Sequence, residues 1–247
     1  MDTLFPLTAV LLAAIVVFAQ SVETVTGFGG TVLSLSLGAH LVPVDRLVVS
    51  LVLVNVVQNT WLVVRGFRHV RMKLLATRVL PLCGAGLAMG ALIFQELGAG
   101  GLKPVLGGFV MTVALLELVR LYRTTARPAA LSPWAASAIL VGGGVFHGMF
   151  ASGGPLVVYF ASRSIPDKHA FRATLSLLWL VLNAVLIVTF SASGRLDRAA
   201  WAVVAAILPA LLLGIVVGEL VHRRVDELRF RKLVQGVLLL TGVFLLV

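Results

Sequence analysis

The stretch ETVTGFGGTV, residues 23–32, places a carboxylate, two threonines before the glycines and three glycines inside an otherwise apolar run. Irregular backbone in hydrocarbon leaves N–H and C=O groups unpaired at a cost of several kcal/mol each, so it persists only inside protein or beside a water-filled cavity. The stretch therefore predicts a broken or re-entrant helix that is surrounded by protein or water.

The composition predicts the class of protein. Of the 247 residues, 60% are hydrophobic and 12% are charged, and the mean hydropathy is +1.06. These values indicate an all-α, polytopic membrane protein. The net charge of +10 would suit nucleic acid, but all twenty Lys and Arg lie in short polar gaps between apolar runs, where they act as orientation signals. We expect no nucleic-acid partner, no cofactor and no metal site; Cys83 is the single cysteine.

The polar gaps divide the chain into apolar runs, most of them near the 20 or so residues that one span needs. The runs are 5–42, 47–64, 74–97, 102–119, 134–162, 173–193, 199–221 and 233–247. The runs 5–42 and 134–162 are too long for one ordinary helix, and each contains a glycine-rich interruption, GFGG or ASGGP. Each is predicted to be a pair of short or broken helices.

Internal similarity equates these two long runs. A shift of 124 residues places Glu23 on His147 and the glycine pair 29–30 on 153–154. A shift of 128 places LPLCGAGLAMGALI (80–93) on LPALLLGIVVGELV (208–221). The chain therefore reads as two homologous membrane repeats, 1–127 and 128–247, which together form one transport domain.

The charges of the loops predict how the repeats are oriented. If each long run enters the membrane and returns, sixteen Lys and Arg fall on one side and four on the other; if each crosses once, the split is even. The positive-inside rule favours the first topology. We expect an inverted repeat with about five membrane elements per half, 8–10 in total, with glycine-rich breaks at the midplane and both termini outside the cytoplasm. Re-entrant hairpins and paired full spans remain equally compatible.

Two breaks at matching positions of an inverted repeat indicate a midplane transport site. Gly29, Gly30, Gly153 and Gly154 let consecutive N–H groups converge, and the start of the following half-helix adds a positive dipole end, so the site should hold an anion. The alternative is that these glycines allow close helix packing, which is the favoured role for the pairs 86/90 and 214/218.

Polar side chains beside the breaks complete the predicted site. Glu23 and His147 are ionisable groups at membrane depth, and either could carry a coupled proton, although either could equally satisfy neighbouring backbone. Asn55 and Asn59 share a helix face, and Asn183 is the counterpart of Asn59 in the second half. These amides could line the substrate path or form interhelical hydrogen bonds.

With its TGFGG at 26–30 and ASGGP at 151–155, the chain resembles the sulfite and sulfonate exporter family TauE/SafE (TSUP). The resemblance extends over essentially the whole chain and implies secondary transport of sulfur-containing anions across the bacterial inner membrane. It implies that the paired motifs line the substrate path. The residues so implied are Thr26, Gly27, Phe28, Gly29, Gly30, Ser152, Gly153, Gly154 and Pro155. Thr31 stands where many members would carry proline, so the two half-sites are unequal.

The sequence thus predicts a transporter of small anions surrounded by lipid, and an exporter rather than an enzyme. A passive anion channel is one alternative. An intramembrane hydrolase with His147 and Ser152 as a dyad is another, although Phe150 stands where a nucleophile motif would have glycine. The substrate, the coupling ion and a homodimeric state are left open.

Overall fold

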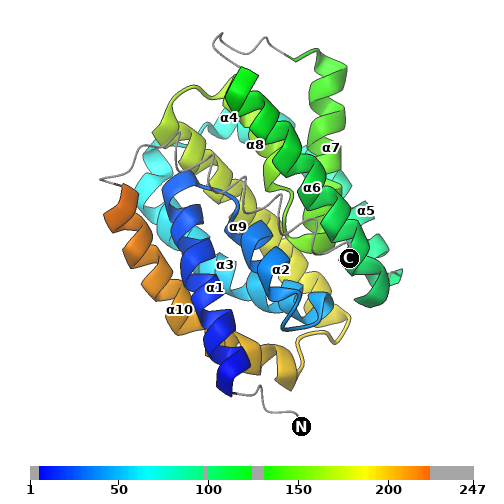
Figure 1. The fold of residues 1–247 in the computed structure, drawn as a ribbon. Coiled ribbons are helices and arrows are strands. Elements are labelled where there is room, and N and C mark those ends of the chain that lie inside the picture. Colours follow the sequence, from blue (N-terminus) through cyan, green and yellow to red (C-terminus); the bar gives the residue numbers. More distant parts are fainter. Residues whose placement is uncertain (1–5, 97–98, 124–130, 223–247) are drawn as a thin grey trace.

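The computed structural model describes residues 6–96, 99–123 and 131–222 and is built of helices throughout those ranges (Figure 1). The helices are α1 (Pro6–Thr26), α2 (Gly30–Gly38), α3 (Val44–Gly66), η1 (Phe67–His69), α4 (Met72–Leu74), η2 (Leu75–Val79), α5 (Leu80–Glu96), α6 (Ala99–Arg123), α7 (Pro133–Phe150), α8 (Gly154–Ser164), α9 (Lys168–Ala192) and α10 (Arg198–His222). The predicted all-α class is confirmed, while the last apolar run, 233–247, lies outside the described residues.

Five segments in the described part of the chain are long and apolar enough to cross a membrane. They are 7–26, 44–69, 72–96, 169–192 and 198–221. Their outward surfaces carry large apolar side chains, among them Leu7, Val64 and Val188, each more than two-thirds exposed in the isolated chain. Lipid covers such a surface in a polytopic membrane protein, and this is the class that the composition predicted.

Glycines bring two helix pairs into close contact, α5 with α7 and α1 with α10. A Cβ at Gly90 would overlap the carbonyl oxygen of Val145 in α7. A Cβ at Gly218 would come within 2.6 Å of Thr24 in α1. The packing role predicted for the pairs 86/90 and 214/218 is therefore confirmed.

The contacts also fix helix directions. Gly214 and Gly218 lie beside Val17 and Thr24 in the same order, so α10 and α1 run parallel. Gly144 of α7 likewise lies beside Cys83 of α5, and Gly148 lies beside Leu87, so α7 and α5 run parallel. By contrast α3 and α9 are antiparallel, because Gly66, the last residue of α3, meets Ala173 near the start of α9.

These directions agree with the equivalences drawn from the sequence. The sequence shifts equate α1 with α7 and α10 with α5, so the parallel pair α1–α10 corresponds to the parallel pair α7–α5. In the same scheme α3 corresponds to α9, the helix that it packs against in the antiparallel direction. The inverted repeat itself stays a prediction, because the proposed boundary at residue 127 and the last run lie outside the described residues.

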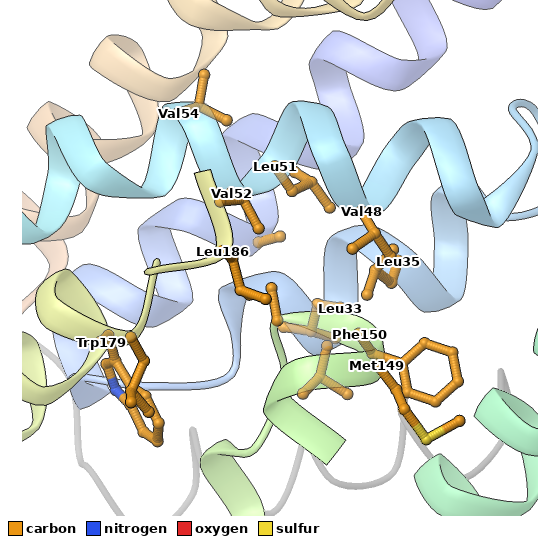
Figure 2. Close-up of a cluster of buried hydrophobic side chains, with 14 of the residues drawn as sticks. Leu33, Leu35, Val48, Leu51, Val52, Val54, Met149, Phe150, Trp179 and Leu186 are labelled. Atoms are coloured by element: carbon orange, nitrogen blue, oxygen red, sulfur yellow. The ribbon is translucent and has the colours of Figure 1, made fainter. Parts of the chain in front are cut away.

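The short helices lie inside the molecule. All but one residue of α2 is buried, and Leu33 and Leu35 pack with Leu51 of α3, Phe150 of α7 and Leu186 of α9 in one core (Figure 2). Because α2 is enclosed by protein, the irregular backbone before it is shielded from lipid, which is the condition under which a broken membrane helix is tolerated.

Candidate functional site

The two glycine-rich segments interrupt helices in the same way. After α1 ends at Thr26, the N–H of Gly27 donates to the carbonyl of Glu23 at 2.7 Å. After α7 ends at Phe150, the N–H of Ala151 donates to the carbonyl of His147, also at 2.7 Å. Glu23 and His147 are the residues that the shift of 124 equates, so the local structure of the breaks follows the sequence similarity.

Left-handed backbone produces both turns. Gly27 and Gly29 have φ of 81° and 95°, and Ala151 has φ of 51°. Glycine adopts such values without strain, whereas alanine does so at a cost. The chain then reverses: a Cβ at Gly30 would touch Glu23, and one at Gly38 would meet Leu12 at 3.3 Å, so α2 returns along α1.

A small enclosed cavity lies between the two breaks. It is lined by Glu23, Phe28, Gly29, Thr31, Val32, Asn55, Asn59, His147, Ala151, Ser152, Gly154, Trp179 and Asn183. A water-sized sphere can move its centre through about 20 Å³, which is room for roughly one water molecule. The asparagines lie near the middle of α3 and α9, helices of 23 and 25 residues, so the cavity is at mid-depth if these helices span the bilayer.

The cavity brings together most of the residues singled out from the sequence. Nine of them line it: Glu23, Phe28, Gly29, Asn55, Asn59, His147, Ser152, Gly154 and Asn183. Thr26, Gly27, Gly30 and Gly153 stand beside it without lining it, and Pro155 lies in the first turn of α8. Thr31, Val32, Ala151 and Trp179 line the cavity but were not predicted as site residues. Trp179 precedes Asn183 by one helical turn, a spacing that could have revealed it.

Glu23 occupies the start of α2. Its side chain is 3% exposed, and its carboxylate lies against the backbone N–H groups of Gly30 and Thr31. A Cβ at Gly30 would overlap this carboxylate and approach the carbonyl oxygen of Ala19 to 2.9 Å. The positive end of α2, which the sequence suggested as half of an anion nest, is thus taken by the protein's own carboxylate.

The second half places different chemistry at the matching position. The buried His147 ring has its Nε2 3.1 Å from Oδ1 of Asn183 and stacks on Trp179 with ring centroids 5.2 Å apart. Its Nδ1 and the Oγ of Ser152 are buried and have no hydrogen-bond partner. The two side chains are therefore not joined as a Ser–His dyad, and Ser152 Oγ is left free beside the first turn of α8.

The amides of α3 are held in defined orientations. Nδ2 of Asn59 donates to the carbonyl of Asn55 at 2.9 Å, and Nδ2 of Asn55 lies 2.5 Å from Oγ1 of Thr31. The Oδ1 atoms of both asparagines are buried without a partner. Both asparagines line the cavity, and each uses one of its two amide N–H groups within the protein while its Oδ1 has no partner.

Charged groups near the breaks are paired with each other. Arg172 of α9 packs against Gly27, where a Cβ would lie 3.3 Å from it, and its guanidinium donates to Glu219 of α10 at 2.8 Å. Glu219 and Arg172 thus form a partly buried ion pair between α10 and α9. Among the described residues that line the cavity there is one carboxylate, Glu23, and neither Lys nor Arg.

Comparison with known proteins agrees with this architecture. The family model described as Sulfite exporter TauE/SafE matches residues 12–245. The chain is 28% identical over 186 residues to the probable inner membrane transporter protein TsaS of Comamonas testosteroni, covering 73% of this chain and 74% of that protein. No solved structure gives a significant match. With the family model matching nearly its whole length, the chain belongs to the Sulfite exporter TauE/SafE family of membrane transporters.

Proposed function

We propose that the protein is a secondary transporter that exports sulfur-containing anions, such as sulfonates or sulfite, across the bacterial inner membrane. The cavity between the two helix breaks is the substrate site. The membrane assignment draws support from TsaS, whose name describes a probable inner membrane transporter, and the substrate class from the description of the family.

The observation that carries the proposal is the donor set on the second-half side of the cavity. The 11-residue helix α8 begins at Gly154, and Ser152 offers a hydroxyl that is 3% exposed and has no partner. Unpaired N–H groups and a positive dipole end at a helix N-terminus bind anions. The corresponding end of α2 is filled by Glu23, so the anion binds at α8.

Neutral donors suit a carrier. On the side of α8 the described lining offers the Ser152 hydroxyl and the backbone at Gly154 and no full positive charge, so a bound anion can also be released. A cavity with room for about one water does not admit a sulfonate. Binding therefore requires the surrounding helices to move apart, which favours a carrier that closes around its substrate over an open channel.

A panel of ligands tests this function. Purified protein should bind methanesulfonate, isethionate or sulfite with a saturable Kd, and binding of acetate or lactate without any sulfur anion would contradict the substrate class. Gly29→Leu should weaken binding about tenfold or more, because the new side chain stands at the cavity.

Gly194→Leu is the matched control for this variant. Gly194 has φ of 68° and Gly29 has φ of 95°, and a Cβ at either position meets nothing within 4 Å, so both substitutions impose comparable backbone strain. Gly194 lies in the turn after α9, away from the cavity. Equal loss of binding in the two variants would show that strain, not the site, is responsible.

A further inference from the structure

The two sides of the cavity differ in hydrogen-bonding character. The side formed by the second half offers donors, namely the start of α8 and Ser152. The other side, which we call the acceptor face, consists of the Glu23 carboxylate and the Oδ1 atoms of Asn55 and Asn59. Both asparagines line the cavity, and their Oδ1 atoms are buried without a partner.

The orientation of Asn59 follows from its partner. A backbone carbonyl can only accept, so the atom 2.9 Å from the Asn55 carbonyl is the amide nitrogen, and Oδ1 is the atom left over. Asn59 and Asn55 are each 1% exposed. Buried polar atoms without a protein partner are rare in folded proteins, and a water, an ion or a ligand usually satisfies them.

Among the residues that the structure describes, no Lys or Arg joins the lining of the cavity to balance the acceptor face. A carboxylate has about four lone-pair sites, and that of Glu23 lies beside the backbone of Gly30 and Thr31 at the start of α2. Two described side chains near the breaks already have partners: Arg172, which packs against Gly27, is bound to Glu219, and His147 bonds Asn183. The C-terminal end of α1 at Thr26 adds the negative end of its dipole to the same region.

We propose that the acceptor face binds a monovalent cation, Na⁺, beside the transported anion. Carboxylate and amide oxygens are ligands of hard cations, and helix ends at broken membrane helices coordinate Na⁺ in transporters. The cavity has room for about one water molecule, which is also the room that a partly dehydrated Na⁺ needs. The inference rests on the proposed function for its second ligand, the anion at α8.

Two opposite charges in one buried cavity strengthen each other's binding. By linkage, Na⁺ must raise anion affinity by the same factor by which the anion raises Na⁺ affinity, and couplings between sites are typically about 5- to 150-fold. We therefore expect Na⁺ in place of choline to lower the Kd for methanesulfonate about tenfold. Methanesulfonate is the probe because it carries no group that titrates near neutral pH.

The experiment measures methanesulfonate affinity in NaCl and in choline chloride at several pH values. Asn59→Leu removes the unpaired oxygen at similar volume and should abolish the difference between the salts. Ser36→Ala is the matched control, since Ser36 Oγ is also buried without a partner but lies outside the cavity lining, and this variant should keep the difference.

A second measurement guards against a variant that fails to fold. The thermal midpoint of the unaltered protein without anion should rise with NaCl more than with choline chloride. Equal methanesulfonate affinity in both salts, or affinity that follows pH and ignores Na⁺, would overturn the cation site and leave the proposed function standing. Failure to bind any sulfur anion, together with a Na⁺-specific midpoint shift, would reject the proposed function and keep the cation site.

Discussion

At the scale of the residue, equivalent positions of the two halves carry opposite chemistry. Glu23 and His147 each stand one turn before a helix break, and each accepts the N–H of the first residue of the break at 2.7 Å. Glu23 fills the start of its own half-helix, whereas His147 turns to Asn183 and leaves the start of α8 open. Similar backbones thus leave one helix start occupied by the protein's own carboxylate and place a histidine, bonded elsewhere, before the other.

Ser152→Ala tests the available site. A hydrogen bond to a charged group contributes about 1.5 kcal/mol or more, so the Kd for methanesulfonate should rise about tenfold, as isothermal titration or scintillation proximity can measure. Ser176→Ala is the matched control, because Ser176 is also buried without a partner but lies outside the cavity lining. An unchanged Kd in Ser152→Ala would remove this hydroxyl from the site.

At the scale of the element, glycine fixes how closely α5 and α7 approach. Gly86 and Gly90 face Gly144 and Gly148 so closely that backbone meets backbone. Without water to drive association, membrane helices depend on such packing. The cavity is lined by residues at the end of α7, so the α5–α7 contact also positions the second break.

Gly90→Ala should destabilise the protein. Its Cβ would overlap the carbonyl of Val145, and overpacking of this kind costs about 1–3 kcal/mol. Gly84→Ala, on the same helix with nothing within 4 Å of the new Cβ, should leave the thermal midpoint in detergent unchanged or slightly higher. If both variants melted alike, the close contact would not stabilise the fold.

The start of α9 depends on Asp167. Its carboxylate accepts from the N–H of Ala170 at 2.7 Å, and this hydrogen bond, aided by the nearby His169 and His69, lowers the pKa of Asp167 below its ordinary 3.8. A lowered pKa means that the stabilisation is present above the ordinary value and is lost as the pH falls through the folded-state value. Asp167→Ala should therefore lower the thermal midpoint at pH 7 and matter progressively less below about pH 4.

Asp167→Asn separates capping from charge. Asparagine also accepts at a helix N-cap, so this variant should retain most of the midpoint at pH 7. A midpoint for Asp167→Ala that fell equally at pH 7 and at pH 3 would contradict the role of the carboxylate.

At the scale of the whole molecule, the directions of the packed helices are compatible with the membrane topology that the loop charges predict. The segment 65–78 is predicted to face the cytoplasm and the turn after α9 to face outward. In a Cys83→Ser background, Ser193→Cys should react with a membrane-impermeant maleimide in intact cells. Arg68→Cys should react only after permeabilisation, and the reverse pattern would reject the topology.

How much of this could be predicted from the sequence differs between the backbone and the side chains. Glycine pairs, run lengths and loop charges predicted the helix breaks at 27–29 and 151–153, because these features are local. The orientation of Asn59 and the seating of Glu23 on α2 depend on contacts between separate helices, so no local pattern indicated them. Val32 and Ala151 are apolar, so their residue types gave no reason to place them in the lining, although Ala151 opens the ASGGP motif.

The central claim is that the protein transports sulfur-containing anions by binding them in the cavity between the breaks and closing around them. Counterflow tests it most directly: proteoliposomes loaded with unlabelled methanesulfonate should transiently accumulate external labelled methanesulfonate, saturably, and the overshoot should shrink in Ser152→Ala. Flux that rises linearly with concentration without an overshoot, or flux no greater than in empty vesicles, would contradict the account.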